Sequence, residues 1–224
     1  MCIDVTSSMQ NCIDTVKARA LKFWPDLHQA LKAASKNITN VRVKVIGFRN
    51  FDVDKANALE ISRYFNLSDQ SGFDQKEFKA FVTNLVTAGG GDGPKNSLEA
   101  LSLAIHSDWV QCQKCRHIIV LFTDASALKL EDTNRMNPYY PSNMPESLDA
   151  LTNLWVAPSS AQGGGTIKLK NAAKRLIVLA PQLYPWSDIY ENWDQVIYHP
   201  STAGGELDDF DWETIMFDLA DYDI

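Results

Sequence analysis

Three short apolar segments constrain the fold of this chain most. They span residues 41–48, 117–123 and 175–180, are rich in β-branched side chains, and are bounded by turn-forming or helix-breaking residues. Near-continuous apolar runs separated by helical patterns are typical of strands in a parallel sheet that is covered on both faces. The sequence therefore predicts a doubly wound α/β fold with a mostly parallel, Rossmann-like central sheet and helices on both faces.

Helical patterns occupy the segments between these strands. The first, residues 9–36, contains Pro25, which we expect to kink or interrupt it. In residues 73–86, five apolar side chains share one helical face and are predicted to point to the core: Phe73, Phe78, Phe81, Val82 and Leu85. Further helices are expected at residues 96–105, 146–156 and 186–193. A weaker strand at 59–67 suits an antiparallel edge partner, and residues 196–199 suit a last strand.

The chain length suits one domain. With 224 residues, we expect a single domain over residues 1–224, with a core of about residues 1–200 and an acidic C-terminal extension over 201–224. In that extension four apolar residues at helical spacing predict a docked amphipathic helix: Trp212, Ile215, Met216 and Leu219. Residues 134–144 and 158–166 are predicted to be surface loops. Only three residues precede Asp4, which is short for a central strand.

Charge and composition exclude several classes of protein. The net charge is −7; no Lys or Arg follows Arg175, so residues 176–224 carry −11 and the rest carries +4. Without a basic stripe, nucleic-acid binding is not expected. No apolar stretch approaches the ~20 residues of a membrane span, and no signal peptide is evident, so a cytoplasmic protein is predicted. Four cysteines in a chain of this length favour reduced thiols over a disulfide framework.

Three loops carry the chemistry that stands out. Asp4, Thr6 and Ser8 follow the first strand, Asp92 lies in the loop Gly-Gly-Gly-Asp-Gly-Pro of residues 89–94, and Asp124 follows the second long strand. Ligand sites of open parallel sheets lie at the carboxyl ends of the strands, so we expect the three loops to converge. Carboxylate and hydroxyl oxygens of this kind suit Mg²⁺, or Mn²⁺, more than Ca²⁺.

These motifs together resemble the metal-ion-dependent adhesion site of von Willebrand factor A domains. The resemblance rests on Cys-Ile-Asp-Val-Thr-Ser-Ser-Met at residues 2–9, on the glycine-rich loop leading into Ser-Leu-Glu-Ala-Leu, and on Arg-His-Ile-Ile-Val-Leu-Phe-Thr-Asp-Ala at 116–125. Residues 174–181 and the Pro-Trp pair at 185–186 are similar to the cytoplasmic bacterial branch seen with tellurite-resistance proteins. The likeness covers about residues 1–200.

The resemblance implies a non-enzymatic protein-binding module with a metal at Asp4, Thr6, Ser8, Asp92 and Asp124. In the family, an Asp or Glu of a partner protein completes the metal's coordination. Two positions depart from the pattern: Ser7 stands where Gly is usual, and Lys95 stands where many relatives have Glu, which predicts a positive charge near the rim.

The charge of the site limits how the aspartates can bind. Three directly coordinating carboxylates would bring −3 against a metal's +2, and a partner carboxylate would then be repelled. At least one aspartate should therefore act through water. We hypothesise that this is Asp4 or Asp124 in the binding-competent state.

Two other readings of the three loops stay open. A Mg²⁺-dependent phosphohydrolase could use Asp4 as nucleophile, although the position of a second catalytic aspartate is held by Thr6, which does not exchange protons near neutral pH. The second alternative is a structural scaffold protein in which the metal site is vestigial. Separately, Cys112 and Cys115 have zinc or redox spacing, but a single pair, even beside His117, is a weak signal.

Overall fold

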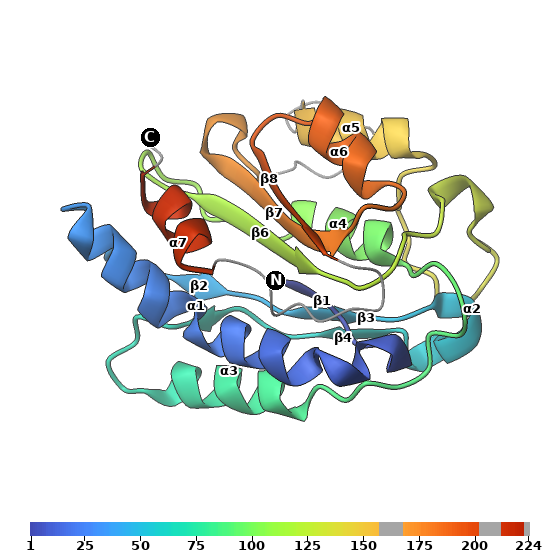
Figure 1. Ribbon diagram of the computed structural model, residues 1–224, viewed down its shortest axis with the longest axis horizontal. Coiled ribbons are helices and arrows are strands. Elements are labelled where there is room, and N and C mark those ends of the chain that lie inside the picture. Colours follow the sequence, from blue (N-terminus) through green and yellow to red (C-terminus); the bar gives the residue numbers. More distant parts are fainter. Residues whose placement is uncertain (157–167, 202–211, 222–224) are drawn as a thin grey trace.

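The computed structural model describes residues 1–156, 168–201 and 212–221 (Figure 1). Its main sheet has six strands in the order β4-β3-β1-β6-β7-β8. The strands are β1 (Cys2–Asp4), β3 (Ile46–Phe48), β4 (Leu59–Ile61), β6 (His117–Phe122), β7 (Lys174–Pro181) and β8 (Val196–Ser201). All neighbours pair in parallel except β3 and β4, which are antiparallel. The predicted fold class, with one antiparallel edge strand, is confirmed.

Two layers of helices bury the sheet. One layer holds α1 (Ile13–Ala33), α3 (Phe73–Asn84) and α7 (Trp212–Asp221), and the other holds α4 (Ser97–Ile105), α5 (Leu148–Val156) and α6 (Trp186–Asn192) (Figure 1). Alternate residues of β6 serve the two cores: Val120 and Phe122 pack toward α1, whereas Ile119 and Leu121 pack toward α4. Burial on both faces explains why the central strands are apolar without alternation.

Several expected elements differ in detail. The segment 41–48 forms two strands, β2 (Arg42–Val43) and β3, because the backbone of Val45 is hydrogen-bonded to Ser62 instead of to a strand. Segment 59–67 likewise divides into β4 and β5 (Phe65–Asn66), and β5 pairs antiparallel with β2. Short elements complete the chain: α2 (Phe51–Asp54), which the sequence did not suggest, and the 3₁₀ turns Ser7–Asn11, Lys55–Asn57, Leu130–Asp132 and Asn171–Ala173.

The structure corrects the sequence expectations at two positions. At Pro25 the predicted interruption does not occur, since α1 continues from Ile13 to Ala33. Its cost is offset by an apolar face that is buried both before and after the proline, from Val16 to Leu31. Phe73 does not face the core as predicted but is 60% exposed at the first turn of α3.

The C-terminal helix docks as expected. In α7, Trp212, Ile215, Met216 and Leu219 are buried against α1 and the sheet. The predicted loop at residues 158–166 lies outside the described residues, whereas residues 134–144 are described and contain no helix or strand. None of the helices in the described ranges combines the length and apolarity that a membrane span requires.

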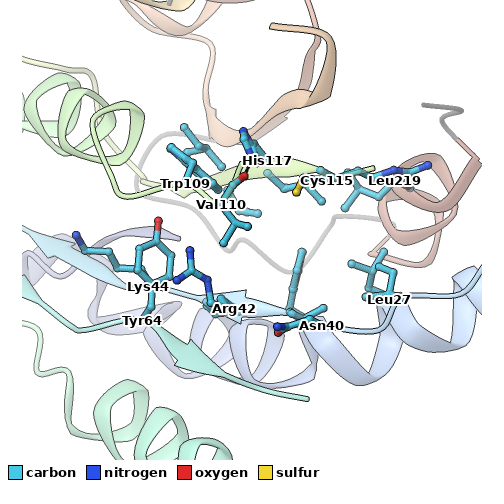
Figure 2. Close-up of a pocket in the computed structure, with 18 of the residues that line it drawn as sticks. Leu27, Asn40, Arg42, Lys44, Tyr64, Trp109, Val110, Cys115, His117 and Leu219 are labelled. Carbon is cyan, nitrogen blue, oxygen red and sulfur yellow. Dashed lines mark hydrogen bonds between the residues drawn. The ribbon is translucent and has the colours of Figure 1, made fainter. Parts of the chain in front are cut away.

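The two ends of the sheet differ. Asp4 and Thr123 lie at the carboxyl ends of adjacent parallel strands, where the candidate site is built. At the opposite end, a pocket of about 780 Å³ opens between the segment preceding β3 and the start of β6 (Figure 2).

Candidate metal centre

A chain of hydrogen bonds joins the first and third loops. Thr123 Oγ1 donates to Asp4 Oδ2 at 2.6 Å, and Thr6 Oγ1 donates to Asp4 Oδ1 at 2.7 Å. Thr6 Oγ1 lies 3.0 Å from Ser8 Oγ, which donates to Asp124 Oδ1 at 2.9 Å. Four of the five predicted site residues are therefore in one hydrogen-bonded set, although Asp4 and Asp124 are 120 residues apart in the sequence.

Asp4 is the most buried member of this set. Its side chain is fully buried, and Oδ1 also accepts the backbone N–H of Thr6 at 2.9 Å. Burial raises the pKa of Asp4 to about 6; the hydrogen bonds from Thr123 and Thr6 oppose that rise, and the nearby charge of Asp124 adds to it. A cation beside this carboxylate would favour its charged form.

Asp124 has an oxygen available for a ligand. Its residue is 4% exposed, and while Oδ1 accepts from Ser8, the buried Oδ2 has no hydrogen-bond partner within the described part of the chain. A buried carboxylate oxygen without a donor costs free energy unless a cation or water satisfies it. This oxygen is the strongest indication that the set accommodates a further group.

The glycine-rich loop packs directly on the first loop. Ser7 N donates to Gly89 O at 3.3 Å, and Ala88 N donates to Val5 O at 3.0 Å. Gly90 has φ +82°, and a Cβ there would lie 2.4 Å from Thr6 Cγ2. A left-handed conformation and this close approach both require glycine.

The glycine-rich loop does not bring Asp92 into the hydrogen-bonded set, contrary to the sequence prediction. Asp92 is exposed, and the described structure shows no hydrogen bond from it to the other four predicted residues. Lys95, expected near the rim, is instead 3% exposed and donates to Gly90 O at 3.1 Å and to Gly91 O at 2.6 Å. The ammonium group of Lys95 lies beneath the loop, where it donates the hydrogen bonds that the carbonyl groups of the two glycines require.

Two supporting residues were not predicted. Thr123, which fixes Asp4, directly precedes Asp124 at the end of the strand, so its position in the sequence was an available signal. Asp54 accepts from the backbone N–H of Gly90 at 2.9 Å and of Asn50 at 3.0 Å, and thereby holds the glycine-rich loop. No local pattern points to Asp54, because the contact joins segments 36 residues apart.

The donors fit a hard cation only with help from hydroxyls and water. In the described ranges, no three or more His, Cys, Asp or Glu side chains gather as a metal-binding group. Asp4, Asp124, Thr6 and Ser8 together offer two carboxylates and two hydroxyls, a set of oxygens that suits Mg²⁺ when waters supply the remaining positions.

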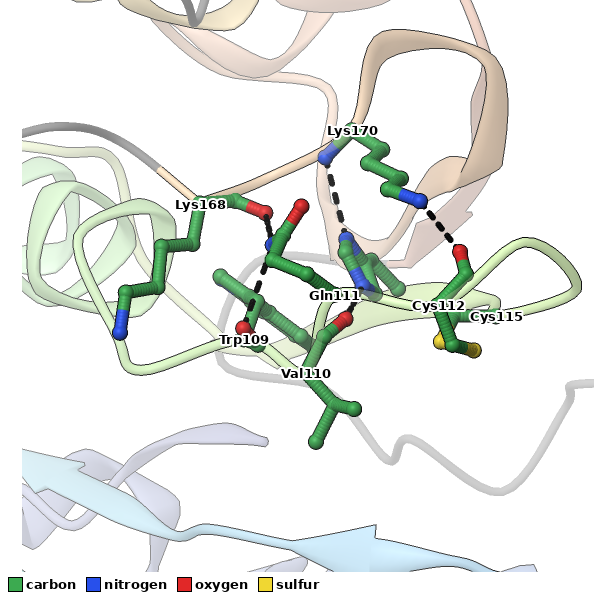
Figure 3. The surroundings of a disulfide bond; sticks show 8 residues. Trp109, Val110, Gln111, Cys112, Cys115, Lys168 and Lys170 are labelled. Carbon is green, nitrogen blue, oxygen red and sulfur yellow. Dashed lines mark hydrogen bonds between the residues drawn. A yellow bond between two sulfur atoms is a disulfide. The ribbon is translucent and has the colours of Figure 1, made fainter.

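The expectation of four reduced thiols is wrong for one pair. Cys2 and Cys12 are buried and are not disulfide-bonded. Cys112 and Cys115 form a disulfide (Figure 3). The pair lies in an exposed turn before β6, which is tied to the segment before β7 by Lys170, whose Nζ donates to Cys112 O. His117 is engaged elsewhere: it pairs with Val110 O at 2.9 Å and accepts from Lys170 N at 3.1 Å. Because both sulfurs are joined, the pair is not a zinc site in this form.

A second buried carboxylate lies on α4. Glu99 is fully buried; its Oε1 accepts from Asn96 Nδ2 at 2.8 Å and from Tyr140 at 3.0 Å, while its Oε2 has no partner among the described residues. Burial raises the pKa of Glu99 from its ordinary 4.5 to about 7. Between about pH 4.5 and 7, Glu99 is therefore protonated in the folded protein and ionised in the unfolded chain.

This proton predicts a pH-dependent effect of Glu99→Gln. The stability associated with protonated Glu99 is complete below about pH 4.5 and is lost as the pH rises through about 7. At pH 8 the variant should exceed the wild type in free energy of unfolding by roughly 2–3 kcal/mol, with little difference at pH 4.5. Urea unfolding at both pH values measures this, with Glu77→Gln on the exposed face of α3 as control. An equal effect at both values would contradict the assignment.

Comparison with known proteins adds a family match. A family model described as the von Willebrand factor A domain matches residues 66–141, about a third of the chain. The matched segment contains the glycine-rich loop, α4, β6 and Asp124. The match covers less than half of the chain and shows a similarity of this segment to von Willebrand factor A (VWA) domains.

Among solved structures, the chain is similar to the pilus adhesin SpaC from Lactobacillus rhamnosus GG. The identity is 12% and the TM-score is 0.49; the similarity covers 97% of this chain and 29% of the adhesin chain. The chain thus spans less than a third of the length of that protein. No curated protein matches the chain.

Proposed function

We propose that this chain is a VWA domain that serves as a non-enzymatic protein-binding module, holds Mg²⁺ between its first and third loops and uses it to engage an acidic residue of a partner protein. The observation that carries the proposal is the hydrogen-bonded set from Thr123 through Asp4, Thr6 and Ser8 to Asp124. The set ends in a buried oxygen that no group in the described ranges satisfies. VWA domains are commonly protein-interaction modules, which supports the protein partner.

The roles of the two buried aspartates follow from their contacts. Both oxygens of Asp4 already accept hydrogen bonds, three in all, whereas Asp124 Oδ2 accepts none among the described residues. Asp124 would therefore bind the cation directly and Asp4 through water. Thr6 and Ser8 would add neutral hydroxyls, and exposed Asp92 would contribute through water at the rim. With one direct carboxylate, the cation keeps positive charge for an acidic partner.

The decisive measurement is a calorimetric titration of the protein with Mg²⁺ and Mn²⁺. We expect one bound ion, and Asp124→Asn should weaken its affinity by at least about tenfold, equivalent to ~1.4 kcal/mol. Asp92→Asn, which removes the same charge at an exposed position of the neighbouring loop, should have the smaller effect. Saturating metal should also raise the melting temperature, since a ligand that binds only the folded state stabilises it.

Absence of both binding and thermal stabilisation would refute the metal role. That result would favour a scaffold with a vestigial site. Equal weakening by Asp92→Asn and Asp124→Asn would contradict the assignment of Asp124 as the direct ligand.

The enzymatic alternative is less compatible with the geometry. A phosphohydrolase needs a nucleophile that a substrate can reach, but Asp4 is fully buried and both of its oxygens are engaged. A phosphoesterase assay with Mg²⁺ and Asp4→Asn tests this directly. A cytoplasmic location and a role in a bacterial stress-response complex, similar to tellurite-resistance systems, complete the proposal and rest on the sequence resemblance alone.

A further inference from the structure

Two side chains of opposite charge hold the backbone of Gly90 from both sides. Asp54 Oδ2 accepts the backbone N–H of Gly90 at 2.9 Å. Lys95 Nζ donates to Gly90 O at 3.1 Å and to Gly91 O at 2.6 Å. Hydrogen bonds with an ionised partner are stronger than those between neutral groups. Asp54 and Lys95 together therefore form a charged clamp on the glycine-rich loop.

Both halves of the charged clamp are anchored outside this loop. Asp54 is the last residue of α2, which follows β3 at this end of the sheet (Figure 1), and its Oδ2 also accepts from Asn50 N at 3.0 Å. The backbone of Lys95 is bonded to the third loop: its N–H donates to Ser126 O at 3.0 Å, and its carbonyl accepts from Leu128 N at 2.7 Å. The clamp thus ties the glycine-rich loop to α2 on one side and to the segment after β6 on the other.

The burial of Lys95 depends on the conformation of the loop. The residue is 3% exposed, and within the described ranges its ammonium forms no ion pair and contacts only the two glycine carbonyls. A buried charge costs free energy unless hydrogen bonds compensate for it. The ammonium therefore favours the loop conformation that turns both carbonyls toward it. It also lies beside the first loop, since the position of a Cβ on Gly90 is 3.3 Å from Lys95 Nζ and 2.5 Å from Thr6 Cβ.

The clamped conformation leaves Asp92 outside the hydrogen-bonded set of the metal centre. Asp92 is exposed and stands between Gly91, which has φ +59° and a clamped carbonyl, and Gly93, which has φ +127°. A Cβ added at Gly93 would meet nothing within 4 Å. Because glycine changes its backbone angles at low steric cost, rotation at these two residues could redirect the Asp92 carboxylate once Gly91 O is released. The clamp opposes that rotation.

We propose that Lys95 and Asp54 are positioning residues that withhold Asp92 from the metal, so that a domain without the charged clamp binds its cation with Asp92 as an additional direct ligand. The inference rests on the proposed function, because it concerns the same cation. A further carboxylate at the metal would neutralise it more fully and leave less charge for an acidic partner. The clamp therefore keeps the site attractive to a partner's carboxylate at the expense of metal affinity.

Calorimetric titrations of variants with Mg²⁺ and Mn²⁺ test this role. Lys95→Met and Asp54→Ala each remove one half of the clamp, and each is combined with Asp92→Asn. In the wild type, Asp92→Asn should weaken metal binding about threefold or less, whereas in either clamp variant it should weaken binding at least about tenfold. A change of net charge alone does not explain that result, because the two clamp variants alter the charge in opposite directions.

Lys55→Met and Asp52→Ala are the matched controls. Both residues are exposed at the same end of the sheet and carry the same charges as the clamp residues. In the described part of the chain, the side chain of Asp52 accepts from Asn137, and neither side chain hydrogen-bonds to the glycine-rich loop. In both control variants, the effect of Asp92→Asn should equal its effect in the wild type.

A second measurement needs no metal. The amide of Ser7 donates to Gly89 O at 3.3 Å, so its hydrogen exchange reports whether the glycine-rich loop stays on the first loop. In EDTA, exchange at Ser7 should be at least about fivefold faster in both clamp variants than in the wild type, because the loop opens more often. Neither substitution removes the hydrogen-bond partner of Ser7. Thermal unfolding shows whether each variant is folded.

The two measurements decide the inference separately from the proposed function. Faster exchange at Ser7 together with a larger effect of Asp92→Asn in the clamp variants supports the inference. Unchanged exchange, or an equal effect of Asp92→Asn in the wild type and in either folded clamp variant, overturns it and leaves the metal site intact. If neither the wild type nor any variant binds a metal, the proposed function fails as well, and the clamp only holds the loop.

Discussion

Gly90→Ala is expected to lower the free energy of unfolding by roughly 3–4 kcal/mol, through a left-handed backbone and a steric overlap together. The residue has φ +82°, and an added Cβ would lie 2.4 Å from Thr6 Cγ2 and 2.5 Å from Thr6 Cβ. These atoms cannot move cheaply, because Thr6 is fully buried and hydrogen-bonded to Asp4. The variant should also lose metal affinity, since Thr6 must shift.

Gly72→Ala separates the two causes. Gly72 has a similar φ of +72°, but the nearest atom to an added Cβ is 3.7 Å away at the end of the flexible Gln75 side chain. Only the backbone cost of about 1 kcal/mol should remain. Urea unfolding of both variants measures the difference, and equal losses would show that Thr6 and the glycine-rich loop are not packed as described.

Arg49→Ala should cost about 3–5 kcal/mol, because it removes a buried guanidinium that joins four segments behind the metal centre. Arg49 is 5% exposed and donates to Val5 O at 3.1 Å, Asn57 O at 2.6 Å and Val86 O at 2.6 Å. It also pairs with Glu60 on the edge strand at 2.7 Å. Alanine removes the Arg49 donor from Asn57 O and Val86 O, while Val5 O keeps the hydrogen bond from Ala88 N. Chemical denaturation measures the loss.

Arg63→Ala is the matched control for Arg49. Arg63 also pairs with a carboxylate, Asp74 at 2.6 Å, but its side chain is 49% exposed. Water replaces such a partner readily, so the loss should be much smaller. If the two variants proved equally stable, the buried network around Arg49 would not hold these segments together.

The elements of this fold could largely be predicted from local patterns. Apolar runs identified β6 and β7, and helical spacing identified α3, α4 and α7. Local patterns were insufficient where a distant contact decides the result. The hydrogen bond between Val45 and Ser62 separates β2 from β3, and the apolar face that is buried on both sides of Pro25 keeps α1 continuous.

The cysteines and the glycine-rich loop show the same limit. Spacing made Cys112 and Cys115 a candidate pair, but whether they are joined depends on the turn that brings their Cα atoms within 5.4 Å. In the loop, residue type favoured Asp92 as a ligand and placed Lys95 at the rim. Backbone angles available to the glycines instead leave Asp92 exposed and bury Lys95 under the carbonyls of Gly90 and Gly91.

The sequence by itself determined that Asp4, Thr6, Ser8 and Asp124 stand at strand ends, because strand periodicity and turn chemistry are local properties of the chain. Only the tertiary structure decided which of their oxygens are already engaged and that Thr123 and Asp54 support them. Those features depend on hydrogen bonds and register between segments far apart in the sequence, which no local pattern encodes.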